Sequence, residues 1–168
     1  MTAESNPAVP VAANRPVVVM RDAIMTGLLG AATIMVWFLV LDTIDGRPLH
    51  TPSVLGTVVT GSEIGAPHEV SIPMVLLYTV IHGVAFVLVG WVAAWMFAFA
   101  EKSPTAIFGL LLLFIFFFCG FISITMLAKP DVLEVVTIPA IITGNLLAAF
   151  VMGRYLWRRH PLDLRRLL

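Results

Sequence analysis

The chain has 168 residues, of which 60% are hydrophobic and 12% are charged, and its mean hydropathy is +1.00. Soluble domains contain roughly 45–50% apolar and about 25% charged residues, so this composition is that of a membrane protein. Ten Lys and Arg balance ten Asp and Glu, which argues against a nucleic-acid partner. The single cysteine, Cys119, excludes an intrachain disulfide framework and a CxxC metal site.

Residues 1–22 are predicted to form a cytoplasmic N-terminal arm. The segment contains Pro7, Pro10 and Pro16 and many alanines, a composition typical of an extended or disordered arm. The apolar segment that follows has no small-residue cleavage site after it, and it is longer than the apolar region of a signal peptide. We therefore expect it to be a retained signal anchor.

Four segments are long and apolar enough to cross a membrane. A spanning helix needs about 20 apolar residues to cross about 30 Å of hydrocarbon. The segments that meet this requirement are residues 23–41, 72–100, 106–128 and about 132–157, with charges only near their edges. The sequence therefore predicts an all-α fold, a four-helix transmembrane bundle over residues 23–157, with a connecting loop over 42–71.

The basic residues predict how the chain is oriented. Eight of the ten Lys and Arg lie in the N-terminal arm, in the connection that holds Lys102, and from Arg154 to the C-terminus, whereas Arg47 and Lys129 lie on the other side. The positive-inside rule then places both termini in the cytoplasm and loop 42–71 outside. The basic tail, residues 158–168, either contacts an anionic leaflet or only stops and orients the last helix.

Small residues at helical spacing indicate where the spans pack. In lipid, helices associate through close backbone approach and interhelical hydrogen bonds rather than through the hydrophobic effect. The positions expected at helix contacts are Gly27, Ala31, Gly83, Gly90, Gly144, Asn145 and Ala148. The alternative is that some of them form a docking face for helices of a partner protein.

The exterior loop, residues 42–71, is much longer than the usual connection of about 4–6 residues. Thr51 followed by Pro52 predicts a helix start with Thr51 as the N-cap, and hence a short helix over residues 53–59. The loop residues expected to contact a partner or one another are Asp42, Asp45, Arg47 and His50.

Two local interpretations of this loop remain open. Arg47 is expected to form an ion pair with Asp42 or Asp45. A cation site that adds His68 and Glu69 to the aspartates is the alternative, although no spacing in the loop matches a metal motif. The sequence therefore predicts no metal site.

His82 is the candidate cofactor ligand. It lies ten residues inside its predicted span, or ~15 Å below the membrane surface at 1.5 Å per residue. One interpretation is a hydrogen bond to Asn145 or Thr33 that fixes the helix register. The other is an axial bond to a tetrapyrrole, either haem or a chlorophyll-type pigment, which would stack on Tyr78 and Phe86. A bis-histidine haem would need a second histidine at this depth, and the sequence has none.

Several segments carry a family resemblance. They are Gly27-Leu-Leu-Gly30, residues 37–42, residues 46–52, Tyr78-Thr-Val-Ile-His82-Gly83 and Gly144-Asn145-Leu146. Together they resemble an uncharacterised family of bacterial four-helix integral membrane proteins. The resemblance implies the four-helix fold and a bacterial inner-membrane location, and it implies no activity.

The function expected from these features is that of a non-catalytic accessory or assembly subunit. No nucleophile–base pair, phosphate loop or metal motif stands in the sequence, so we expect no enzyme activity. The predicted partners are membrane lipids and other subunits of a larger energy-transducing complex, either photosynthetic or respiratory. The alternatives are a tetrapyrrole-binding protein that uses His82, and a small transporter or lipid-acting enzyme that uses the exterior Asp and His residues.

Overall fold

The computed structural model describes residues 15–61, 70–100, 109 and 136–159. Every extended regular element in these residues is a helix: α1 (Arg15–Ile44), α2 (His50–Val59), α3 (Ile72–Ala100) and α6 (Ile138–Arg159). The prediction of a helical protein is thereby confirmed for the described residues. Apart from Gly109, the predicted third span, residues 106–128, lies outside them, as do residues 1–14 of the arm and most of the basic tail.

Three of the described helices are long and apolar enough to cross a membrane: Met20–Ile44, Ile72–Phe99 and Ile138–Arg159. The shortest has 22 residues, which at 1.5 Å per residue is ~33 Å, against about 30 Å of hydrocarbon. α3 has the predicted bounds, whereas α1 extends beyond residues 23–41 at both ends. The membrane-protein prediction is supported, with three of the four predicted spans in the described residues.

α6 begins at Ile138, six residues after the start of the predicted span. A proline inside a helix bends it, because proline removes a backbone donor. In the structure Pro139 lies in the first turn of α6, where the N–H has no intrahelical acceptor in any case. Proline therefore helps to start this helix instead of kinking it.

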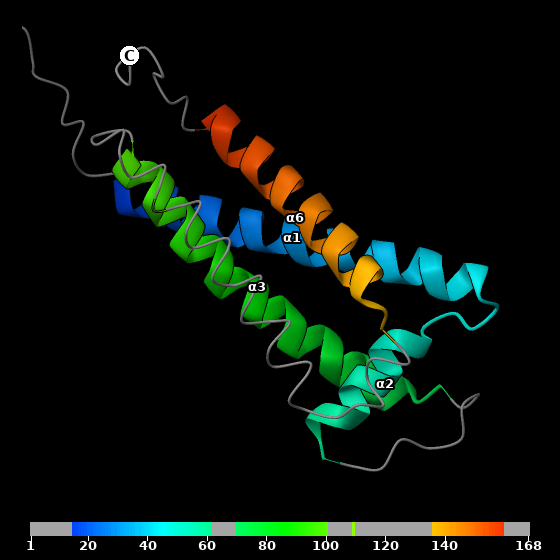
Figure 1. The fold of residues 1–168 in the computed structure, drawn as a ribbon. Coiled ribbons are helices and arrows are strands. Elements are labelled where there is room, and N and C mark those ends of the chain that lie inside the picture. Colours follow the sequence, from blue (N-terminus) through cyan, green and yellow to red (C-terminus); the bar gives the residue numbers. More distant parts are fainter. Residues whose placement is uncertain (1–14, 62–69, 101–108, 110–135, 160–168) are drawn as a thin grey trace, which may run out of the picture.

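α1 is the central helix of the three long ones (Figure 1). It packs against both α3 and α6, which make few contacts with each other. The N-terminal end of α1 lies with the C-terminal ends of α3 and α6, so both neighbours run antiparallel to α1. We call this the arginine end, after Arg21, Arg154, Arg158 and Arg159; the other is the α2 end, comprising residues 42–61 and 70–75.

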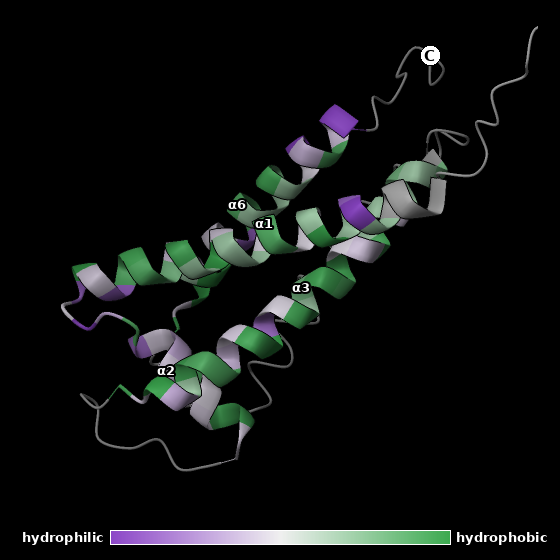
Figure 2. Cartoon of the chain, turned by 180° about the vertical axis from the view of Figure 1, so that it is seen from behind, coloured by the Kyte–Doolittle hydropathy of each residue, from purple (hydrophilic) through white to green (hydrophobic). Residues whose placement is uncertain are grey.

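α1 and α3 cross near the arginine end and diverge toward the α2 end, where the short helix α2 lies between them (Figures 1 and 2). α2 packs mainly on α3. Gly56 of α2 lies against the backbone of Met74, close enough that a Cβ at this position would collide with the Met74 carbonyl. α2 therefore keeps α1 and α3 apart at the α2 end.

Apolar side chains face outward from the long helices. On α3, the exposed fractions of Leu76, Val80 and Leu88 are 61%, 64% and 59%. The hydrophilic residues of α1 and α6 lie chiefly near the helix ends (Figure 2). This distribution is the one expected for helices surrounded by lipid or by apolar partner helices.

Candidate functional site

The α2 end contains a buried carboxylate that joins α1 to α2. Asp42 is 6% exposed, and its two carboxylate oxygens accept hydrogen bonds from a single residue, Thr51. The Thr51 backbone N–H donates to Oδ2 at 2.8 Å, and the Thr51 hydroxyl donates to Oδ1 at 2.6 Å. Asp42 therefore supplies the acceptor that the first turn of α2 lacks within its own helix.

The start of α2 differs from the prediction that Thr51 is its N-cap. The residue at the cap position is Leu49, which has a left-handed φ of 66° and makes no side-chain cap. Thr51 lies inside the first turn, and the Arg47 N–H donates to the carbonyl oxygen of Asp42 at 2.7 Å to close the preceding turn. The predicted short helix is present, but its cap comes from a carboxylate nine residues upstream.

Ser53 of α2 extends the polar cluster of Asp42 and Thr51 toward α3. Its hydroxyl oxygen accepts a hydrogen bond from the Ser71 N–H at 2.9 Å, one residue before α3 begins. Ser53 and His50 are both buried, with exposed fractions of 3% and 8%. Buried polar groups are costly unless they are bonded, so this cluster ties three segments of chain together.

Asp45 and Arg47 are exposed beside the cluster. Within the described residues, Arg47 forms no ion pair with Asp42 or Asp45, so the predicted pairing is wrong: the Asp42 carboxylate bonds Thr51 instead. No group of three His, Cys, Asp or Glu side chains that could hold a metal ion occurs there either. The other two candidates for a cation site, His68 and Glu69, lie outside the described residues.

His82 lies on α3 between two aromatic rings. The Tyr78 ring stacks on the imidazole at 5.3 Å between centroids, and the Phe86 ring packs at 4.6 Å from the other side. His82 Nδ1 lies 3.4 Å from the Tyr78 hydroxyl, while Nε2 is buried with no hydrogen-bond partner in the described part of the chain. The imidazole also approaches the backbone of Ala31 on α1.

This geometry bears on both predicted roles of His82, a hydrogen bond that fixes the helix register and ligation of a tetrapyrrole. The hydrogen bonds expected to Thr33 or Asn145 are not present in the described residues: the Thr33 hydroxyl donates to Leu29 O, one turn back on its own helix. Tyr78 and Phe86 pack on the imidazole itself, and Nε2 is covered. A tetrapyrrole metal would therefore reach His82 only after the ring turned away from α1.

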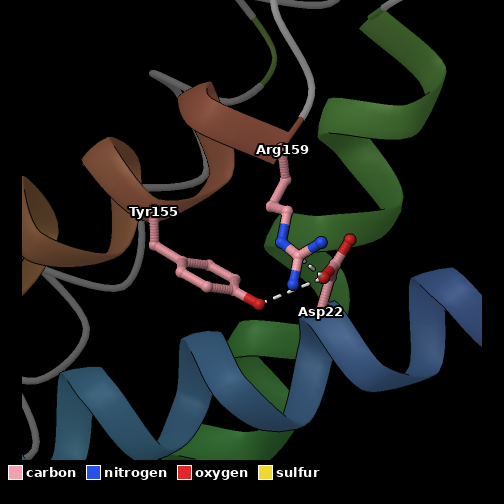
Figure 3. Close-up of polar contacts among 3 residues, drawn as sticks. All are labelled: Asp22, Tyr155 and Arg159. Atoms are coloured by element: carbon pink, nitrogen blue, oxygen red, sulfur yellow. Dashed lines mark hydrogen bonds and ion pairs between the residues drawn. The ribbon is translucent and has the colours of Figure 1, made fainter.

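The arginine end contains a second buried carboxylate, Asp22 of α1, which is 1% exposed (Figure 3). The Tyr155 hydroxyl donates to Asp22 Oδ1 at 3.1 Å, and Arg159 Nε lies 3.7 Å from the same oxygen. The Arg159 guanidinium also lies 5.8 Å from the centre of the Tyr155 ring. The sequence alone gives little sign of this contact: Tyr155 and Arg159, four apart, share one face of a helix.

Trp37 joins α1 to α6 nearer the α2 end. Its indole N–H donates to the carbonyl oxygen of Ala140 at 2.9 Å. Gly144 makes room for the ring, because a Cβ there would lie 2.8 Å from Trp37 Cδ1. α1 and α6 are therefore fixed by polar contacts near both of their ends.

The positions predicted for helix packing fall into two groups. Gly27, Gly90 and Gly144 lie where a Cβ would collide with a neighbouring helix, and Ala31 and Ala148 are buried, at 5% and 3% exposed. Gly83 and Asn145 differ from these: Gly83 has open space where its Cβ would be, and Asn145 is half-buried on α6.

Each buried polar cluster in the described residues connects helices. None of these clusters combines a nucleophile with a base and an open approach for a substrate. Comparison of the chain with protein-family models, with curated proteins and with solved structures finds no match. The function must therefore be argued from the residues themselves.

Proposed function

We propose that the protein is a non-catalytic accessory or assembly subunit of a larger, energy-transducing complex in the bacterial cytoplasmic membrane. In this proposal the four predicted spans cross the bilayer, the arginine end and both termini face the cytoplasm, and the α2 end faces outward. The distribution of basic residues supports the orientation, because four arginines lie at the arginine end and Arg47 at the other.

The observation that carries the proposal is the way the α2 end is built. Asp42 uses buried hydrogen bonds and Ser53 a partly buried one to hold α2 between α1 and α3, and Gly56 lets α2 lie directly on the α3 chain. This construction fixes the surface turn that joins α1 to α2, in which Asp45 and Arg47 are exposed. A fixed surface of this kind suits recognition by another protein, because little conformational entropy is lost on binding.

The same contacts argue against the enzyme or transporter alternative. Asp42 is one of its candidate groups, and both carboxylate oxygens are engaged by Thr51. His50 is 8% exposed, whereas Asp45 and Arg47 are on the surface, so the four side chains do not converge on one open site. A reactive centre would need these groups to meet around a space for substrate.

The outward apolar surfaces of the long helices support a role among other membrane subunits. Three exposed side chains of α3, Leu76, Val84 and Trp95, are 61%, 57% and 58% exposed. Because lipid and partner helices offer equally apolar surroundings, such faces accept either neighbour. The surface contacts proposed for the α2 end supply the specificity that these faces lack.

The test is a pull-down of the tagged full chain in mild detergent from its native membrane, followed by mass spectrometry and an absorption spectrum of the eluate. Co-purification with subunits of one energy-transducing complex in fixed stoichiometry is the expected result. A charge-reversed variant, Asp45→Lys with Arg47→Glu, should lose the partner while remaining folded. Recovery of a single, colourless protein from native membranes would overturn the proposal.

The absorption spectrum also decides the tetrapyrrole alternative. A Soret or far-red band that travels with the isolated chain and disappears in His82→Ala would establish ligation by His82. A band that travels with the complex and persists in His82→Ala belongs to another subunit and agrees with the accessory role. Substitution of the neighbouring Thr79 by Ala is the matched control, since it leaves the imidazole in place.

A further inference from the structure

Three exposed arginines at the arginine end form no ion pair within the described residues: Arg21 of α1, and Arg154 and Arg158 of α6. Arg159, by contrast, lies against the buried Asp22 carboxylate. The positions of the three exposed arginines follow from the way α1 and α6 face each other.

Residues that follow one another in an α-helix are turned by about 100°. On α1, Asp22 faces α6, as its contact with Tyr155 shows. Ala23 is turned to one side, where it is buried with Ala94 of α3, so Arg21 must lie on the other side, away from α3.

On α6, Tyr155 faces α1. Leu156 is turned toward α3, in one buried cluster with Ala23 and Ala94. Arg154 is therefore turned away from α3, and Arg158 lies one turn further on the same face. Because α6 runs antiparallel to α1, Arg21, Arg154 and Arg158 lie on one side of the α1–α6 pair.

No carboxylate in the described residues offsets these three charges on that side. Among the described residues, the acidic residue at this end is Asp22, and it is buried and engaged by Tyr155 and Arg159 (Figure 3). The charge presented to the surroundings by the three arginines is therefore positive.

An exposed apolar strip continues from the arginines along the same side of the two helices. By the same helical phase it consists of Met25 and Leu28 on α1 and of Leu147 and Phe150 on α6. Their exposed fractions are 41%, 49%, 39% and 69%. Trp157, which is 45% exposed, lies at the level of the arginines, where indole rings sit at the headgroup boundary.

We propose that this side of the α1–α6 pair binds an anionic phospholipid. The phosphate headgroup lies between Arg21, Arg154 and Arg158, since guanidinium groups bind phosphate oxygens in pairs. The acyl chains run along the apolar strip of α1 and α6. This proposal rests on the proposed function, in which the long helices cross the membrane. It adds the class of lipid that the protein binds.

The test uses the purified full chain, stripped of lipid in detergent and titrated with phosphatidylglycerol or phosphatidylcholine, with bound lipid counted by native mass spectrometry. Each basic residue contributes about 1 kcal/mol near an anionic headgroup, which is about fivefold in affinity. Arg154→Gln with Arg158→Gln should therefore weaken phosphatidylglycerol binding about 25-fold and phosphatidylcholine binding much less, because the choline ammonium offsets the charge of its phosphate. Arg47→Gln, an exposed arginine at the α2 end, is the matched control and should change neither.

Three results would overturn the site. They are equal affinity of the unaltered protein for the two lipids, an equal loss in Arg47→Gln, and complete displacement of the lipid by inorganic phosphate, which would make the arginines a free-phosphate site. Circular dichroism identifies variants that fail to fold, and Arg21→Gln then provides an independent variant on the other helix. The assay uses the isolated chain, so its outcome is separate from partner capture in the pull-down.

Discussion

Gly90 of α3 lies against Gly27 of α1, so closely that a Cβ added to Gly90 would lie 2.5 Å from the Gly27 nitrogen and 2.5 Å from the Ala23 carbonyl oxygen. A substitution at Gly27 is equally crowded, since a Cβ there would lie 2.5 Å from Val87 Cα. Every neighbouring atom in these contacts belongs to backbone. A larger residue at Gly27 or Gly90 would therefore clash with backbone atoms, and no side-chain rotation could remove the clash.

The first prediction concerns this crossing. Gly90→Val should destabilise the protein by about 1–3 kcal/mol, because overpacked helices must separate. Gly83→Ala is the matched control on the same helix: its Cβ would meet open space, and alanine is about 1 kcal/mol better than glycine inside a helix. Unfolding in a denaturing detergent, followed by circular dichroism, measures both. Equal stability of the Gly90→Val protein and the unaltered protein would contradict the crossing.

The second prediction concerns the buried carboxylate at the α2 end. Asp42→Ala leaves the Thr51 N–H and hydroxyl without their acceptor, and we expect a loss of about 1–3 kcal/mol. Hydrogen exchange of the α2 amides should accelerate more than that of α3. Asp45→Ala, an exposed aspartate three residues away, should change neither stability nor exchange. Similar behaviour of the two variants would show that Asp42 does not hold α2.

The third prediction concerns Asp22 and Tyr155. Tyr155→Phe removes a hydrogen bond to a buried carboxylate, and bonds to charged groups are worth about 1.5–3 kcal/mol. In a double-mutant cycle with Asp22→Ala, the two losses should be less than additive, because both changes remove the same contact. Arg159 is expected to contribute less, since its side chain is 45% exposed and 3.7 Å away. Strict additivity of the two substitutions would refute the contact.

The fourth prediction concerns Trp37. Trp37→Phe removes the N–H that donates to Ala140 O and should lower stability by about 0.5–1.5 kcal/mol, in addition to any loss of packing. Trp91→Phe is the matched control, because that indole is 49% exposed on α3. Thermal unfolding monitored by circular dichroism compares the two. A larger effect at Trp91 than at Trp37 would argue against the α1–α6 contact.

The apolar segments of the sequence predict the long helices well, and the reason is physical. A backbone in hydrocarbon must satisfy its own hydrogen bonds, so a long apolar segment has little choice but to form a helix. This constraint places α3 at residues 72–100 as observed. It says less about where a helix ends in the polar region, so the ends of α1 and the start of α6 were predicted less accurately.

The contacts between helices were predicted less fully than the helices. Small residues indicate that neighbours approach closely, but each helix offers several such positions, and packing selects among them: Gly90 is crowded whereas Gly83 is open. The contact of Asp22 with Tyr155 joins residues 133 positions apart, and that of Asp42 with Thr51 overrides a local capping pattern. Neither partner can be found from spacing within one segment.

The order in which the chain is synthesised gives the α1–α6 contacts a further meaning. α1 emerges from the ribosome before every other described helix, and α6 emerges last, so Asp22 and Trp37 await partners that are made 133 and 103 residues later. During that interval Asp22 has neither the Tyr155 hydroxyl nor Arg159 beside it, and burial of a carboxylate is costly while its bonding partners are missing. Insertion of α6, the last described helix, then brings Tyr155 and Arg159 to Asp22 and allows the carboxylate of α1 to become buried.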